Sequence, residues 1–177
     1  MIGTLLTTPA LDRSDLVAVP VGDALRARPD FADVVLVAEI DPQLADTAAF
    51  CAEYQVGLEQ SANCVVVSGK REGEVRYAAC VVLATTRADV NGVVRRYLNV
   101  RKASFAPMET AVAETGMEYG GITPIGLPKD WPILIDSRVV AVPHAIIGSG
   151  VRRSKLVLPG SALADLPGAE VIPDLAR

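Results

Sequence analysis

Cysteine, histidine and aromatic residues are scarce in this chain, and each shortage narrows what the protein can be. Its 177 residues include three cysteines and one histidine, and only 5% are aromatic. Cys51, Cys64 and Cys80 cannot all pair within one chain and form no Cys-x-x-Cys motif, so we expect reduced thiols. A single histidine, with no cluster of cysteines and carboxylates at ligand spacing, gives no basis for a metal site. We therefore expect no metal and no cofactor.

Long hydrophobic runs are also missing. The apolar runs near Val34–Ala38, Ala78–Ala84 and Val139–Ile147 fall short of the roughly 18 residues that span a bilayer. The first eight residues lack the basic segment and long apolar stretch of a secretory signal. We therefore expect a soluble, cytoplasmic protein without a membrane partner.

The charge balance limits the way in which nucleic acid can bind. A net charge of -4 argues against a protein that coats nucleic acid, because that mode neutralises many phosphates, and we expect no DNA partner. Small basic groups occur at Arg95-Arg96, at Arg101-Lys102 and at Arg152, Arg153 and Lys155. They are either ordinary solvated charges or contacts to a few phosphates at the end of an RNA.

Half of the residues are hydrophobic, which suffices for one sizeable core, so we expect a single domain over residues 1–177. β-rich runs at Asn63–Val67 and Val75–Leu83 flank a polar segment, Gly69–Gly73, and predict a hairpin. Asp41-Pro42 is typical of a helix start and leads into an amphipathic pattern that reaches Tyr54.

The other expected elements follow from apolar runs and end signals. Helices are expected at Asp23–Arg28, at Val90–Leu98 after a cap by Thr86 or Asp89, at Glu109–Gly116 and at Ser161–Leu166; strands are expected at Val34–Ala38, Ile133–Ile135, Ala145–Ile147, Leu156–Leu158 and Glu170–Ile172. The helices and strands do not alternate regularly, so the pattern predicts an α/β (mixed α+β) domain rather than a doubly wound parallel sheet.

Three segments between residues 120 and 155 carry the candidate chemistry. In the first, Gly120 and Gly121 allow a ligand to approach main-chain N–H groups, Thr123 offers a hydroxyl, and Pro124 stiffens the loop. The alternative is a flexible helix-to-strand connection. In the second, Asp136 ends an aliphatic run, where it either binds a ligand hydroxyl or hydrogen-bonds to nearby backbone N–H groups.

The third segment combines a glycine turn with cations. Gly148, Ser149 and Gly150 precede Arg152 and Arg153, an arrangement that can hold phosphate or ribose oxygens or can be a plain β-turn. The only histidine, His144, would have to serve any imidazole-based mechanism, but no neighbouring acid or serine completes one, which favours a structural role.

The order and spacing of these segments resemble the YbaK family of aminoacyl-tRNA editing domains. The similarity is clearest over residues 100–166 and weaker over 42–98, while residues 1–40 stay unassigned. It implies a mixed, partly barrel-like sheet flanked by helices. It also implies that the Gly120–Pro124 loop lies at an aminoacyl pocket, with Asp136 near it and the glycine turn facing the tRNA 3′ end.

One position departs from the family pattern. Editing members usually carry a lysine in a strand whose counterpart here is Asn63–Val66, so Cys64 or a close neighbour takes its place. A neutral thiol cannot stabilise developing charge as an ammonium does. Lys70 falls in the expected turn, which leaves Lys102 and Lys155 as replacements from other elements.

The resemblance leads to two main hypotheses, beside a third in which the same pocket serves a small-molecule hydrolase or binder of an amino-acid ester or nucleotide. The first is a deacylase that hydrolyses the ester of a mischarged tRNA, with cysteine or alanine on proline tRNA as the first substrates to test. The second is a catalytically impaired module that binds a tRNA 3′ end, an aminoacyl-adenosine-like ligand or a protein partner. The tRNA acceptor end is the expected partner of the first, and a synthetase is a further candidate.

Overall fold

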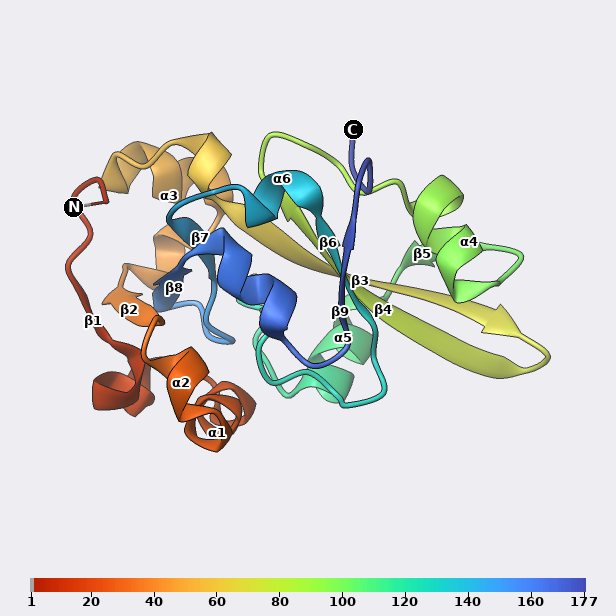
Figure 1. The fold of residues 1–177 in the computed structure, drawn as a ribbon, viewed down its shortest axis with the longest axis horizontal. Coiled ribbons are helices and arrows are strands. Elements are labelled where there is room, and N and C mark those ends of the chain that lie inside the picture. The colour runs from red at the N-terminus through yellow and green to blue at the C-terminus, as the bar shows by residue number, and fades with distance from the viewer. Residues whose placement is uncertain (1) are drawn as a thin grey trace.

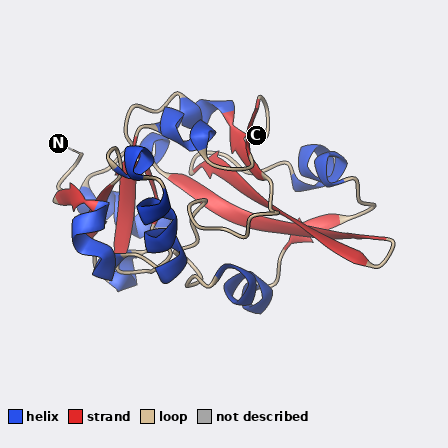
Figure 2. Ribbon diagram, turned by 60° about the horizontal axis from the view of Figure 1, so that its bottom comes forward, coloured by secondary structure: helices blue, strands red, loops and turns tan. Residues whose placement is uncertain are grey.

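Residues 2–177, which the computed structural model describes, fold into two β-sheets surrounded by short helices (Figures 1 and 2). The first sheet has the order β1-β2-β8-β7 and is antiparallel throughout. Its strands are β1 (Thr7–Pro9), β2 (Leu36–Glu39), β7 (Ala145–Gly148) and β8 (Ser154–Leu158). The second sheet has the order β5-β3-β4-β6-β9 and is mixed, because β6 runs parallel to both β4 and β9. Its strands are β3 (Ala62–Arg71), β4 (Glu74–Leu83), β5 (Ala103–Phe105), β6 (Ile133–Asp136) and β9 (Ala169–Ile172).

The helices are short and cover both sheets. They are η1 (Ala10–Leu16), α1 (Val19–Ala27), α2 (Pro29–Ala32), η2 (Pro42–Leu44), α3 (Thr47–Tyr54), η3 (Leu58–Gln60), η4 (Val90–Val94), α4 (Arg95–Leu98), α5 (Met108–Thr115), α6 (Ser137–Val140) and η5 (Gly160–Asp165). Within residues 2–177, no helix is both long and apolar enough to cross a bilayer.

The predicted mixed α/β class is confirmed. The strands nevertheless form two sheets rather than one, and neither sheet closes into a barrel over the described residues. An isolated bridge between Ser61 and Ile146 links the start of β3 to β7 of the other sheet. The sheets therefore adjoin at one point, and the candidate site lies near it.

The predicted hairpin is present and is longer than expected. The turn consists only of Glu72 and Gly73, whose φ angles of 53° and 81° are the two positive values that a type I′ turn requires. Lys70 and Arg71 therefore belong to β3 rather than to the turn.

The helix predicted from Asp41-Pro42 to Tyr54 is two elements. Asp41 accepts a hydrogen bond from the backbone N–H of Gln43 (2.9 Å) and starts only η2. Asp46 then accepts from the backbone N–H of Ala48 (3.1 Å) and starts α3. Each aspartate therefore caps its own short helix.

Residues 2–40, which the family resemblance left unassigned, contribute to the main core. Leu16, Val21 and Leu25 are at most 1% exposed and belong to the same apolar cluster as Leu156 and Leu158 of β8. Strand β2 pairs with β1 on one side and with β8 on the other. This segment therefore positions β7 and β8, which carry part of the candidate site.

Candidate functional site

A cavity of about 370 Å³ lies where the two sheets adjoin. Its walls come from β3, the ends of β5, β7 and β8, the start of α3, helix α5 and the loop before residue 123. The lining residues are Ala45, Asp46, Thr47, Ala62, Asn63, Cys64, Val65, Val66, Phe105, Ala106, Ala111, Tyr119, Gly120, Ile122, Gly148, Arg152 and Lys155. The cavity thus contains four of the predicted site residues, namely Gly120, Gly148, Arg152 and Cys64.

The two glycine segments pack directly against each other. The backbone N–H of Gly150 donates to the carbonyl of Gly121 (2.7 Å), and the N–H of Glu118 donates to the carbonyl of Gly150 (2.9 Å). A Cβ atom at Gly148 would lie 2.5 Å from the carbonyl oxygen of Gly121, which is too close for any side chain. Segments almost 30 residues apart in the sequence therefore form one wall of the cavity.

Arg152 lies across this wall. Its guanidinium donates to the carbonyls of Tyr119 (3.4 Å) and Pro42 (3.2 Å), and its side chain is half-buried. A Cβ atom at Gly120, whose φ is +88°, would collide with the Arg152 guanidinium. The neighbouring Arg153 is exposed and donates to the carbonyl of Asp15 instead, so only the first arginine faces the cavity.

Lys155 supplies a second cation to the cavity from β8. It stands opposite Gly148 in the β7–β8 register. Its Nζ donates to the carbonyl of Ala45 (3.3 Å) and lies 5.4 Å from the centre of the Phe50 ring. Burial lowers the pKa of Lys155 below its ordinary value, with the nearby Arg152 cation acting in the same direction. Among residues 2–177, no carboxylate lies within ion-pair distance of Nζ, although Asp46 lines the same cavity.

Cys64 lines the opposite wall and packs partly against the main core. Burial in these apolar surroundings raises the pKa of its thiol well above the ordinary range. The thiol is therefore protonated at neutral pH and is a poor nucleophile. All three cysteines are free.

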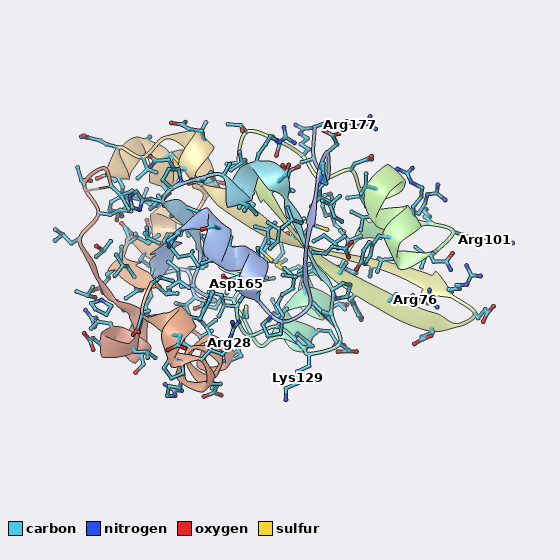
Figure 3. The ribbon with its side chains drawn as sticks, in the orientation of Figure 1. Arg28, Arg76, Arg101, Lys129, Asp165 and Arg177 are labelled. Atoms are coloured by element: carbon cyan, nitrogen blue, oxygen red, sulfur yellow. The ribbon has the colours of Figure 1, made fainter. Side chains whose placement is uncertain are left out.

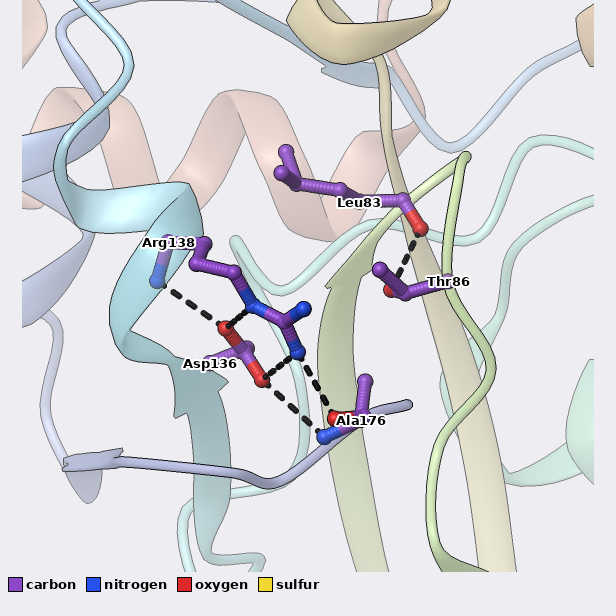
Figure 4. A network of polar contacts seen from close by, with 5 residues as sticks. All are labelled: Leu83, Thr86, Asp136, Arg138 and Ala176. Carbon is purple, nitrogen blue, oxygen red and sulfur yellow. Dashed lines mark hydrogen bonds and ion pairs between the residues drawn. The ribbon is translucent and has the colours of Figure 1, made fainter.

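Asp136 does not line the cavity, contrary to the expectation that it lies near the aminoacyl pocket. Its carboxylate is 1% exposed and accepts hydrogen bonds from the Arg138 guanidinium (2.8 and 2.9 Å) and from the backbone N–H groups of Arg138 (2.9 Å) and Ala176 (3.0 Å) (Figure 4). Burial raises the pKa of this carboxyl, but these hydrogen bonds outweigh it and leave the pKa below its ordinary value. Asp136 caps α6 and fixes the C-terminal segment, which is the alternative that its strand-end position left open.

The other predicted binding residues do not line the cavity, contrary to the expectation that they contact the substrate. The buried Ser149 hydroxyl accepts from Ser154 Oγ (2.7 Å) and lies 3.0 Å from the carbonyl oxygen of Val151. Thr123 is fully buried, and its hydroxyl has no hydrogen-bond partner within residues 2–177. Pro124 lines a separate apolar cavity of about 220 Å³. Gly121 and Gly150 make the backbone contacts between the segments.

His144 is exposed between α6 and β7, outside the cavity lining. Its side chain does not line the cavity, so the structure gives no position from which it could act as a base there.

Several lining residues were not predicted. Asp46 and Thr47 lie at the start of α3, and Thr47 Oγ1 donates to the Asn63 side chain (3.0 Å). Phe105 and Tyr119 stand at the rim and are 60% and 54% exposed. The only sequence signal for them was an aromatic residue shortly before a proline or glycine, in Phe105-Ala106-Pro107 and Tyr119-Gly120, and such sequences are common on protein surfaces.

The comparisons with known structures agree on the fold. A candidate trans-editing enzyme for prolyl-tRNA synthetase matches with a TM-score of 0.73 and 21% identity, over 87% of this chain and 93% of that chain. The hypothetical protein APE2540 matches with a TM-score of 0.76 and 18% identity, over 89% and 99% of the two chains. A scaffold protein used for computational epitope grafting gives 0.74 and 22%, over 88% and 95%.

The family model is more specific than these structural matches. The model of the aminoacyl-tRNA editing domain matches residues 41–166, which include every residue that lines the cavity. This range also coincides with the region where the sequence resembles the YbaK family. The chain belongs to the aminoacyl-tRNA editing domain family.

Proposed function

We propose that the protein hydrolyses the ester that joins an amino acid to the 3′-terminal adenosine of a mischarged tRNA. The observation that carries this proposal is the cavity itself, in which Lys155 and Arg152 face a glycine wall. The tRNA acceptor end is the partner, and a synthetase that releases mischarged tRNA is a second one. The solved structure described as a trans-editing candidate adds support at the level of the fold.

The chemistry needs water and no protein nucleophile. Water attacks the ester carbonyl carbon, the bond from that carbon to the ribose oxygen breaks, and the amino acid leaves as a carboxylate. One proton of the water returns to the ribose hydroxyl and the other passes to solvent. Cys64 takes no covalent part, because burial keeps its thiol protonated.

Lys155 has the role that the family assigns to a lysine on another strand. The ester carbonyl gains negative charge as water adds, and the Lys155 ammonium stabilises that charge from β8. A cation that is poorly solvated interacts strongly with charge developing beside it. Its lowered pKa reflects that poor solvation. Arg152 stands next to it and orients the ribose or the adjacent phosphate.

The lining favours a small apolar amino acid. Ala62, Val66, Ala111 and Ile122 form the apolar part of the cavity, whose volume of about 370 Å³ is near the lower limit for ligand sites. The family resemblance makes cysteinyl and alanyl esters of proline tRNA the first substrates to test, and both amino acids are small enough for this cavity. No step of this scheme uses a metal.

The test is a panel of purified mischarged tRNAs with the wild-type protein and a Lys155→Met variant. We expect release of the amino acid by the wild type and a loss of about 10²- to 10³-fold in kcat for the variant, since a charge-stabilising group is removed. Lys129→Met is the matched control, because Lys129 is exposed and outside the cavity (Figure 3). Cys64→Ala retains activity in this scheme. Full activity of Lys155→Met would contradict the assigned role.

A binding module is the second candidate, and the neutral Cys64 is the observation that favours it. If the protein releases no amino acid above buffer from any substrate but binds an aminoacyl-adenosine analogue, it is a binding module rather than an enzyme. Cys64→Lys then becomes informative, because activity gained in an inert parent would identify the missing lysine as the cause.

A further inference from the structure

The positive charge of this acidic protein is concentrated at one end of the second sheet. We define the basic lobe as residues 70–76, at the tip of the β3–β4 hairpin, together with residues 95–102, which include α4. It contains seven of the 17 lysines and arginines but only two of the 21 acidic residues. The lobe is therefore strongly cationic on a chain whose net charge is -4. Its position is marked by Arg76 and Arg101 in Figure 3.

The lobe is a built structure rather than a set of loose side chains. Arg71 donates to the backbone carbonyl and side-chain oxygen of Asn99 (3.1 and 2.8 Å), and Arg76 donates to the carbonyl of Leu98 (2.9 Å). A Cβ atom at Gly69 would lie 2.5 Å from Val100, so glycine lets the two segments pack closely. The hairpin tip is thereby fixed against the end of α4.

The cations of the lobe are available to an anion. Within residues 2–177, none of the seven forms an ion pair with a carboxylate. Lys70, Arg71 and Arg101 converge, together with Glu72, on a hollow of about 370 Å³. Convergent lysine and arginine side chains are suited to phosphate oxygens.

The lobe is connected to the cavity by two neighbouring strands. Val66 of β3 lines the cavity and Lys70 lies four residues further along that strand, about 13 Å away at the usual strand rise. Phe105 of β5 stands at the cavity rim, and Lys102 directly precedes that strand. An extended RNA strand that leaves the cavity along this edge would pass Phe105, an exposed ring on which a base can stack, before it reaches the lobe.

We propose that the basic lobe binds the acceptor-strand phosphates of tRNA upstream of the terminal adenosine while the cavity holds the aminoacyl end. This inference rests on the proposed function for the identity of the RNA. In this arrangement the lobe supplies the affinity for the polynucleotide, and the cavity supplies the chemistry.

The test compares two double variants that each remove two positive charges. Lys70→Gln/Arg101→Gln changes the lobe, and Arg26→Gln/Lys129→Gln changes one exposed arginine and one exposed lysine elsewhere. Binding is measured by fluorescence anisotropy with uncharged, labelled tRNA over a range of salt concentrations. We expect the lobe variant to raise Kd about tenfold and to reduce the salt slope by about two, and the control to bind like the wild type.

Hydrolysis assays separate this inference from the proposed function. The lobe variant should raise KM for aminoacyl-tRNA with kcat unchanged, and it should cleave an aminoacyl-adenosine ester at the wild-type rate. If the protein hydrolyses nothing, the proposed function fails, and the binding comparison still decides the role of the lobe. Wild-type tRNA affinity and an unchanged salt slope in the lobe variant would overturn the inference. The inference would also be overturned if the lobe variant bound RNA like the wild type but no longer bound purified prolyl-tRNA synthetase. The lobe would then be a protein-docking surface.

Discussion

Asp136 illustrates how one carboxylate can stabilise the fold without contacting the cavity. Its side chain is 1% exposed and accepts hydrogen bonds from Arg138 and Ala176. Asp136→Asn removes the charge from these bonds, and we expect the free energy of unfolding at pH 7 to fall by about 2–3 kcal/mol. Chemical denaturation measures this change, and Asp130→Asn, at an exposed position, is the control.

The pH dependence of this effect has a definite sign. The pKa of Asp136 is lowered in the folded state, so its stabilisation is complete above the ordinary aspartate pKa of about 4 and is lost as the pH falls through the folded-state value. The difference between wild type and Asp136→Asn should therefore shrink below pH 4. Equal stability of the two proteins at pH 7, or loss of hydrolysis by a stably folded variant, would contradict a purely structural role.

The sequence could not decide the role of single residues such as Asp136 and Lys155. An aspartate at the end of a strand is equally compatible with a ligand contact and with a cap, since its partner Ala176 is 40 residues away. The reach of Lys155 depends on the β7–β8 register and on α3, which covers its face of the sheet with Phe50. The glycines were easier to predict, because close backbone approach admits no other residue.

At the scale of elements, helix α1 offers a direct test of how the N-terminal segment packs. Leu25 is fully buried in the main core, whereas Val19, at the start of the same helix, is 75% exposed. We expect Leu25→Ala to lower the free energy of unfolding by about 2–5 kcal/mol, since it removes apolar contacts and leaves a cavity. Val19→Ala should change it by less than about 0.5 kcal/mol. Equal effects, measured by urea denaturation, would mean that α1 does not contribute to the core as the structure has it.

Elements with a local apolar pattern were predictable, including the short strands β2, β6, β7, β8 and β9, whereas the three-residue strands β1 and β5 were not. The β3–β4 hairpin and α5, which Gly116 ends with a φ of 67°, have local patterns that are long enough to recognise. Strands β1 and β5 have three residues each and gain their stability from pairing with distant segments. Pro20 and Pro29 are helix-start signals, since they stand in the first turns of α1 and α2.

At the scale of the whole molecule, the order of the expected helices and strands predicted a mixed α/β fold, but composition could not reveal the separation of charge. A net charge of -4 argued against extensive nucleic-acid contact, yet the fold gathers seven cations from two separate segments at one end. The pairing of β3 with β5 brings the second of these segments beside the first. Average charge therefore describes this protein poorly, because the cationic end arises from the pairing of two strands.

The family match begins at residue 41, but we expect residues 2–40 to be indispensable for folding. Their removal would leave one edge of β8 unpaired, because β2 lies between β1 and β8. It would also remove Leu16, Val21 and Leu25 from the main core, each worth about 1.5–3 kcal/mol of apolar burial, from a total stability of about 5–15 kcal/mol.

The corresponding experiment compares the full chain with a fragment that starts at Asp41. We expect one cooperative unfolding transition for the full chain, followed by circular dichroism and by tryptophan fluorescence, because a shared core links both sheets. The fragment should lack that transition and should not hydrolyse aminoacyl-tRNA. Leu6→Ser, at a position 89% exposed, controls for changes in the N-terminal segment that leave the core intact. A fragment that unfolds cooperatively near the wild-type temperature would show instead that residues 41–177 fold independently and that the N-terminal segment only packs upon them.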